Sequence, residues 1–196
     1  MDQYYITTEV QKKKFFNEVF YNLRDSKDNT RITLTQKGMN PSFYPYISWP
    51  ILSEGKRIGK IERKKFSIMP NFKIIFNGKK LVLIRKWGIS PKYFIKGNNW
   101  SIESKLVGKY FNRLPTASLA ESVPDGFEFT LNDENNQVVA NFGLDTDSEE
   151  YIFNIDIFND EYDKTDIFLI ILAVYLEIQE VTEIGLTRIM VLKNVG

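Results

Sequence analysis

The side chains in this sequence that could do chemistry are lysines, arginines and carboxylates, because the 196-residue chain contains no histidine and no cysteine. Histidine is the commonest general base and transition-metal ligand, and cysteine supplies thiolate nucleophiles and disulfides. Histidine- and cysteine-based catalytic triads and zinc sites are therefore excluded within one chain. We predict a protein that is not an enzyme, with no catalytic residues, no metal site and no cofactor.

Basic residues concentrate in segment 51–96, which holds 13 lysines and arginines against 2 acidic residues. Each such residue contributes about 1 kcal/mol near an anionic membrane surface. We therefore predict a site for an anionic lipid or phosphate group, formed by Arg63, Lys64, Lys65, Lys79, Lys80, Arg85, Lys86 and Lys92. The alternative is a solvated face that discourages pairing between sheet edges. Nucleic acid is disfavoured, because core packing explains Trp87 and Tyr93 better than base stacking does.

The net charge of +1 hides a division along the chain. Residues 1–113 carry 23 basic and 8 acidic residues, whereas residues 114–196 carry 3 basic and 17 acidic residues. Such asymmetry indicates either a basic face used for binding or two halves that neutralise one another in the fold. The sequence leaves both interpretations open.

Two acidic segments could bind a cation, but neither has the required pattern. Segment 145–156 has Glu150 where a calcium loop needs glycine, and Asp156 where it needs glutamate. Segment 160–166 is more typical of a turn that caps a helix. We predict a metal site in neither segment.

Ten consecutive apolar residues run from Ile167 to Leu176. A membrane-spanning helix needs about 20 apolar residues, and an exposed strand of this composition would aggregate. A helix that is apolar on all sides is instead buried on all sides. The run predicts a central helix at about 165–180, capped by Thr165 and ended at Gly185, and no transmembrane segment.

Residues 55–76 and 78–96 repeat one pattern: Gly-Lys, apolar positions with basic neighbours, an aromatic residue, then x-Ile-x-Pro. Each copy starts at a turn signal, Glu54-Gly55 or Asn77-Gly78, of the kind that joins two strands of a hairpin. The pattern predicts a meander of hairpins, and such a sheet can avoid exposed edges by closing. Segment 12–24 is ambiguous, because Phe15 to Leu23 fit a strand as well as a helix, and periodicity alone favours the helix slightly.

The pattern G-K-x-I-x-x-I-x-R-K-K-F-S-I-x-P-x-F-x-I, its repetition, and the acidic stretch before DIFLIILAVYLEIQ resemble the LURP-one-related family. This family belongs to the tubby-like C-terminal domain superfamily, with the phospholipid scramblases. The resemblance is clearest from about residue 45 to 180. It implies a mainly β fold: a closed antiparallel β-barrel of about twelve strands, threaded by a central hydrophobic C-terminal helix. It also implies a single domain over 1–196, with YYITTEV and FFNEVFYNL as the first strands. The tail that contains TRIMVLK extends beyond the helix at which the family ends, and we predict an extra strand there at 186–193.

The resemblance also implies a function. Tubby proteins bind phosphoinositide headgroups through basic side chains, whereas the cysteine-dependent lipid anchoring of scramblases is missing from this chain. The small size and the lack of a signal peptide suit the bacterial members of the LURP-one group. We expect a cytoplasmic, non-catalytic binding module, peripheral at the membrane. The alternative is a structural or interaction protein that forms a homodimer, with Val82 and Ile84 facing outward under the partner.

Overall fold

The computed structural model describes residues 2–14, 17–37, 46–64, 71–86, 91–107, 126–144 and 153–193, the last fourteen of these by their backbone. These residues form twelve strands and one helix. The strands are β1 (Asp2–Lys12), β2 (Asn17–Asp25), β3 (Thr30–Lys37), β4 (Tyr46–Ser53), β5 (Lys56–Lys64), β6 (Asn71–Phe76), β7 (Lys79–Lys86), β8 (Lys92–Lys96), β9 (Trp100–Val107), β10 (Gly126–Asn132), β11 (Val138–Leu144) and β12 (Phe153–Ile157). The helix is α1 (Lys164–Lys193).

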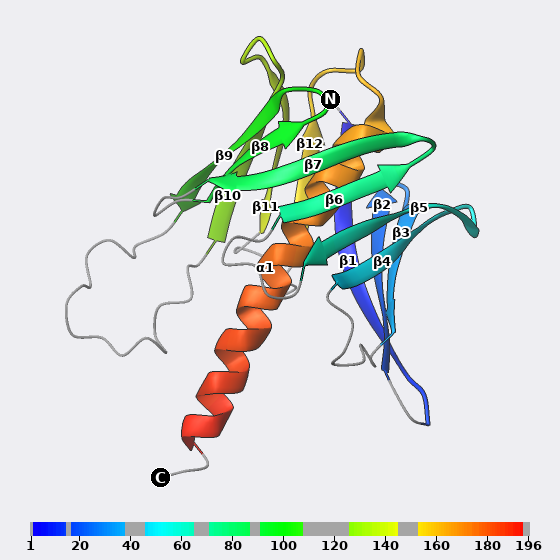
Figure 1. Cartoon of the computed structure of the whole chain (residues 1–196), viewed down its shortest axis with the longest axis vertical. Helices are drawn as coiled ribbons and strands as arrows, with labels where there is room; N and C mark the ends of the chain where they lie inside the picture. Colours follow the sequence, from blue (N-terminus) through cyan, green and yellow to red (C-terminus); the bar gives the residue numbers. More distant parts are fainter. Residues whose placement is uncertain are drawn as a thin grey trace, which may run out of the picture.

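Each strand pairs in antiparallel fashion with the next strand along the chain, and β12 pairs with β1. The closing ladder runs from Asp2 opposite Ile157 to Ile6 opposite Phe153. The sheet is therefore a closed barrel in which no strand of the series is left as an open edge (Figure 1). The predicted fold class, a closed antiparallel barrel with a C-terminal helix, is confirmed.

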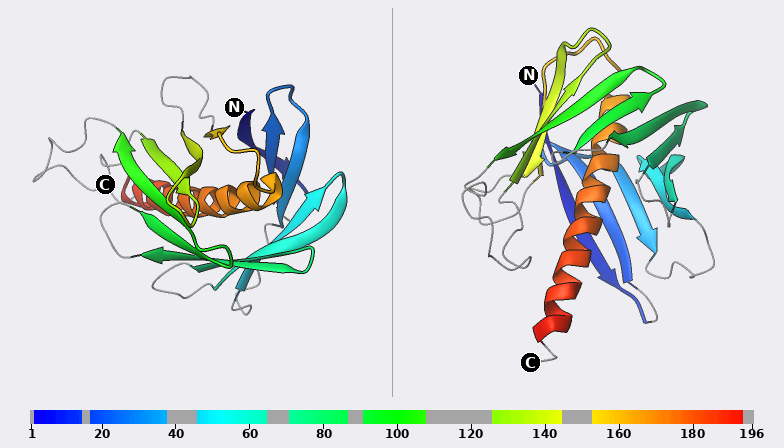
Figure 2. Two further views of the ribbon diagram at one scale, coloured as in Figure 1. Left: turned by 90° about the horizontal axis from the view of Figure 1, so that it is seen from above. Right: turned by 60° about the vertical axis from the view of Figure 1, so that its left-hand side comes forward.

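The first half of α1 lies inside the barrel, with strands on several sides of it in the view from above (Figure 2, left). Every residue from Ile167 to Leu176 is buried, and Leu172 has no exposed surface. The Tyr175 ring packs 5.0 Å from the Phe153 ring, and its hydroxyl lies 2.9 Å from the Thr8 hydroxyl. The ten apolar residues are thus the centre of the core, as the sequence predicts.

The two ends of α1 differ from the prediction. Asp163 caps the helix, because its Oδ1 accepts a hydrogen bond of 2.9 Å from the Thr165 amide, and Thr165 lies within the first turn. The helix also continues through Gly185 to Lys193, so the predicted end at Gly185 and the extra strand at 186–193 are wrong. One glycine costs a helix about 1 kcal/mol, which the helix-favouring residues around it can offset. No helix in the described part of the chain is long and apolar enough to cross a membrane.

Segment 17–25 is strand β2, so the helix that periodicity favours is wrong there and the strand that the resemblance implies is correct. Its residues pair with β1 on one side and with β3 on the other. Tyr21 and Leu23 point into the core. Phe15 and Phe16 lie outside the described residues. Pairing on both sides satisfies the backbone of this segment, which a period count along the chain cannot detect.

The two ends of the barrel are different. At one end, which we call the turn end, tight turns join the strands and α1 begins; at the other, the exit end, α1 leaves the barrel (Figure 1). The predicted hairpin turns are confirmed at the turn end. Glu54 and Gly55 have φ of 49° and 74°, and Asn77 and Gly78 have φ of 44° and 78°. Positive φ at both central residues is the conformation that two-residue hairpins prefer.

Two further turns at the turn end are organised by buried aspartates. Oδ1 of Asp25 accepts the amides of Lys27 and Asn29 at 3.0 and 2.9 Å. Oδ1 of Asp133 likewise accepts two amides, from Asn135 and Gln137, at 2.8 Å each. Burial alone would raise the pKa of Asp25, but these hydrogen bonds and those from the Asn29 and Arg31 side chains lower it to about 2. Both carboxylates therefore organise the turns in which they lie.

Gly59 in β5 allows the close approach of β6. A Cβ atom at this position would lie 2.1 Å from the Ile75 carbonyl oxygen and 2.7 Å from the Phe76 Cβ. Gly59→Ala is therefore expected to lower the free energy of unfolding by about 1–3 kcal/mol, the usual range for overpacking. Urea unfolding measures this loss, and Gly55→Ala is a comparison, because open space surrounds Gly55 and only its positive φ opposes a side chain. Equal stability of Gly59→Ala and the unmodified protein would contradict the packing of β5 against β6.

Candidate anion-binding face

Alternation along β5–β8 decides which basic residues reach solvent. Ile61, Leu83, Tyr93 and Ile95 are buried and face α1, so their sequence neighbours face outward. We call the outward-facing side of these four strands the basic face. Its lysines are Lys60, Lys64, Lys73, Lys80, Lys86, Lys92 and Lys96.

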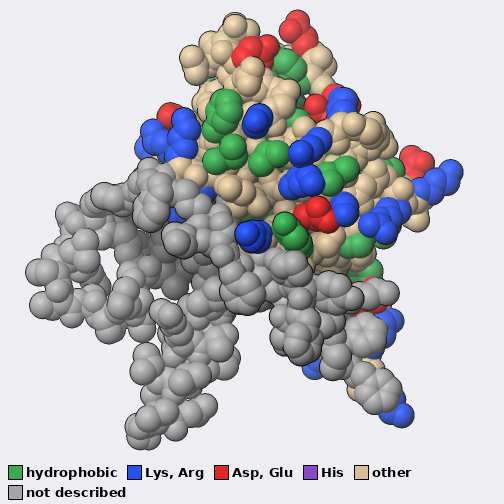
Figure 3. Space-filling model, viewed as in Figure 1, with side chains coloured by type: hydrophobic (Ala, Val, Ile, Leu, Met, Phe, Trp, Pro, Cys, Tyr) green, Lys and Arg blue, Asp and Glu red, His purple; other side chains and the backbone are tan. Residues whose placement is uncertain are grey.

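Apolar side chains lie among these lysines. Ile75, Val82, Ile84 and Phe94 face outward and are partly buried. Ile84 is paired with Phe94 across the β7–β8 ladder, and the Lys86 Nζ lies 5.8 Å from the centre of the Phe94 ring. Figure 3 shows basic and apolar side chains interspersed over this side of the molecule. The prediction that Val82 and Ile84 face outward is confirmed.

Four of the eight predicted ligand-binding residues lie on the basic face and are exposed: Lys64, Lys80, Lys86 and Lys92. The Lys92 Nζ lies 3.0 Å from Glu103, but both side chains are more than half exposed, so water weakens this ion pair. Lys64, Lys80 and Lys86 form no ion pair with any acidic residue in the described ranges. Lys65 lies outside those ranges.

Of the other three predicted residues, Arg63 and Arg85 face the interior, and Lys79, whose side chain is 52% exposed, lies beside the start of α1. Lys79 lies at the turn end, where its Nζ is 3.4 Å from Asp166 and 3.6 Å from Asp163 at the start of α1. The negative charge of Asp166 raises the pKa of Lys79. Lys79 is therefore partly neutralised by the acidic start of α1, through ion pairs that water weakens, and it lies outside the basic face.

Arg63 and Arg85 lie at the exit end, around a carboxylate of α1. The Arg85 Nη1 is 2.5 Å from Oε1 of Glu177, whose side chain is only 4% exposed. Burial raises the pKa of Glu177, and Arg85, Tyr93 and Arg63 oppose that rise. We call these four residues the interior charge cluster. It was not predicted, because a sequence does not show which strand residues face the helix.

The charge division of the sequence has two origins in the structure. Lys79 and Arg85, from the basic half, are neutralised by Asp166 and Glu177, from the acidic half. On the basic face, Lys60 pairs with Glu62 at 2.5 Å and Lys73 is half-buried, whereas the other five lysines stay exposed to solvent. Neutralisation by α1 therefore accounts for the positive charges of Lys79 and Arg85. A surface with positive charge remains on the outside of β5–β8.

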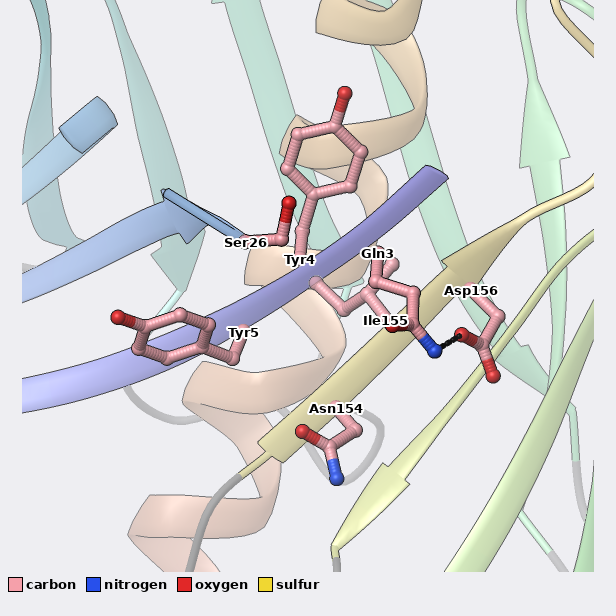
Figure 4. Close-up of a pocket in the computed structure, with 7 residues that line it drawn as sticks. All are labelled: Gln3, Tyr4, Tyr5, Ser26, Asn154, Ile155 and Asp156. Carbon is pink, nitrogen blue, oxygen red and sulfur yellow. Dashed lines mark hydrogen bonds between the residues drawn. The ribbon is translucent and has the colours of Figure 1, made fainter. Parts of the chain in front are cut away.

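A cavity in the described part of the chain lies elsewhere. It has a volume of about 310 Å³ and lies between β1, β12 and the β2–β3 turn (Figure 4). Its lining residues are Gln3, Tyr4, Tyr5, Ser26, Asn154, Ile155 and Asp156. Gln3 Nε2 donates a hydrogen bond of 3.3 Å to Asp156 across it. The cavity contains no basic residue and lies on the opposite side of the barrel from β6 and β7, so it is not part of the basic face.

The acidic segments do not form a metal site in the described residues, where no three carboxylates come together in a suitable group. Residues 145–152, which include most of the calcium-like segment, lie outside these ranges. In segment 160–166, Asp163 caps α1 and Asp160 forms an ion pair of 3.0 Å with Lys164. This segment is a capping turn, as the sequence indicates.

Comparisons with known proteins found no matching family model, no matching curated protein and no matching solved structure. The resemblance to the LURP-one-related family therefore stays a prediction. The function has to be argued from the geometry of the barrel.

Proposed function

We propose that this protein is a non-catalytic binding module of the LURP-one-related type, whose basic face binds an anionic ligand of the phospholipid headgroup class. The observation that carries the proposal is the grouping of seven outward-facing lysines on four adjacent strands. Three of these, Lys64, Lys80 and Lys86, have no acidic partner in the described residues. Exposed, unneutralised positive charge is what an anionic surface attracts.

The type of basic residue supports a surface rather than a single tight pocket. Lysine is a hydrated point charge on a flexible chain, whereas arginine makes the planar two-point contacts typical of pockets for one phosphate group. The outward-facing bases of β6–β8 are all lysines, and the arginines of β5 and β7 near the exit end face inward. The partly buried Val82, Ile84 and Phe94 between the lysines suit the boundary between headgroups and acyl chains.

Vesicle flotation tests this proposal directly. We expect the protein to float with vesicles that contain an anionic lipid and to stay unbound with purely zwitterionic vesicles. Binding should weaken from low salt to physiological salt, because exposed charges are screened over about 8 Å at physiological ionic strength. No flotation with anionic vesicles at low salt would leave the proposal without support, and the basic face would then be a solvated surface.

Reversing two charges of the basic face should weaken this binding. We expect Lys64→Glu together with Lys86→Glu to reduce affinity for anionic vesicles by more than tenfold, since two lost lysines cost about 2 kcal/mol before repulsion is added. The fold should survive, because exposed substitutions change stability by less than about 0.5 kcal/mol. Circular dichroism checks the fold, and the same substitutions to glutamine, which remove charge without reversing it, should have a smaller effect. Unchanged flotation of the glutamate variant would contradict the proposed face.

A second candidate function is self-association through the same strands. The observation that favours it is the outward position of Val82 and Ile84 beside Phe94. If a second copy covers them, light scattering should show a dimer at tens of micromolar, and Ile84→Lys should convert it to a monomer. A monomer of the unmodified protein at that concentration would remove this candidate.

A further inference from the structure

At the described ends of the strands around the exit end, the exposed charges are almost all positive. Within two positions of the strand ends there, the described and exposed bases are Lys12, Lys13, Lys14, Lys64, Lys86, Lys92 and Lys105. Glu128 is the one exposed carboxylate in the same described positions. These lysines come from β1, β5, β7, β8 and β9, so they are distributed around the rim of the barrel and are not confined to the basic face. We call them the lysine rim.

The turn end has no such excess. Its exposed bases, which include Lys27, Lys56 and Lys80, are accompanied by exposed carboxylates from neighbouring turns. These carboxylates are Asp28, Glu54, Glu134, Asp160, Glu161 and Asp163. Among the described strand ends and turns, exposed positive charge therefore predominates at the exit end, whereas the turn end is mixed. A polarised charge distribution orients a molecule toward a charged surface.

Two elements project at the exit end, the β1–β2 hairpin and the second half of α1 (Figures 1 and 2). The hairpin carries Lys12, Lys13 and Lys14 near its tip, and Val10, three residues before Lys13, is 55% exposed. Helix α1 continues for sixteen residues past Glu177, or about 24 Å. Glu180 and Glu183 lie near the start of this projecting part, and its last ten residues, IGLTRIMVLK, contain no acidic residue and two basic ones. Basic residues at the tip of the helix are attracted to an anionic bilayer surface.

We infer that the exit end of the barrel is the part that meets the membrane, with the lysine rim against the headgroups of an anionic bilayer and the barrel axis directed into it. This inference rests on the proposed function and names the contact surface. It differs from contact through the side of the barrel in a way that can be measured. An end-on contact includes Lys12 and Lys13, which are far from β6 and β7. It does not include Lys80 and Lys96, which lie at the turn end of the basic face.

Two charge-matched double variants separate these geometries by flotation on vesicles of phosphatidylcholine with phosphatidylserine at low salt. We expect Lys12→Glu with Lys13→Glu to weaken binding at least tenfold, and Lys80→Glu with Lys96→Glu to weaken it less than threefold. Both pairs are exposed and change the net charge equally. The reverse order would overturn the end-on contact and leave the proposed function standing. Absence of binding by the unmodified protein would overturn both.

A fluorescent label gives an independent readout, because the chain has no cysteine and a single introduced one is labelled uniquely. An environment-sensitive dye on Gln11→Cys, near the hairpin tip, should shift to shorter wavelength when anionic vesicles are added. The same dye on Ser26→Cys, in the β2–β3 turn, should not shift. A shift at Ser26 and none at Gln11 would overturn the inference. So would a shift at Gln11 that grows with protein concentration without vesicles, since a second copy would then cover the exit end.

Discussion

Leu172→Asp is expected to abolish folding of the barrel. Leu172 lies in the middle of α1 and has no exposed surface, so the aspartate would be a buried carboxylate with no partner. Such a group costs several kcal/mol, which is comparable with the total stability of about 5–15 kcal/mol of a typical domain. Circular dichroism and urea unfolding measure the outcome.

Leu172→Met is the matched control, because it nearly conserves the volume and should cost less than about 1.5 kcal/mol. If Leu172→Asp folds cooperatively with the same strand content as the control, the helix does not fill the barrel. The same pair of variants thus tests the architecture without any knowledge of the ligand.

Arg85→Met is expected to lower the free energy of unfolding by about 3 kcal/mol, the usual cost of removing one partner from a buried ion pair. The variant keeps most of the side-chain volume but leaves the Glu177 carboxylate without its 2.5 Å partner. The double variant Arg85→Met with Glu177→Leu should recover most of the loss, since replacing a whole buried pair by apolar residues is often neutral. Urea unfolding of the unmodified protein, of Arg85→Met, of Glu177→Leu and of the double variant forms a double-mutant cycle. Purely additive losses would contradict a direct interaction between Arg85 and Glu177.

The loss in Arg85→Met should depend on pH with a definite sign. Burial already raises the pKa of Glu177 in the folded protein, and removal of the Arg85 charge should raise it further. Above the ordinary value of about 4.3 the unfolded chain holds fewer protons on this group than the folded chain, so stability falls as the pH rises through that range. The difference between Arg85→Met and the unmodified protein should therefore be larger at pH 7 than at pH 4. An equal difference at both values would mean that Glu177 is not the group left unpaired.

Much of the fold could be predicted from short patterns, because each pattern has a local physical cause. Ten apolar residues in a row have no stable place except a buried helix, as Leu172 illustrates. Asn77-Gly78 adopts the positive φ that a two-residue hairpin needs. The alternation in β12 places Phe153, Ile155 and Ile157 in the core. Repetition of such hairpins predicted a meander, and its closure into a barrel followed from the apolar helix that it has to surround and from the family resemblance.

Other features depended on partners that are distant in the sequence. Segment 17–25 is a strand because β1 and β3 supply hydrogen bonds on both of its sides, not because of its own periodicity. The cap of α1 is Asp163 rather than Thr165, since the direction in which the chain leaves β12 decides which side chain meets the first amides. These are choices between local conformations of similar energy, and the surrounding structure decides between them.

The candidate site shows the same division. Composition and spacing determined that β5–β8 carry excess positive charge and that the chain lacks the residues for histidine or cysteine chemistry. Only the ladder register and the helix inside the barrel decided that Lys64 and Lys86 face water while Arg63 and Arg85 face Glu177. Adjacent residues of a strand point to opposite sides, and which side is the interior depends on what the closed sheet encloses. The charges of the face were therefore readable in the sequence, but their separation into a solvent-exposed set and a set neutralised by α1 required the closed barrel.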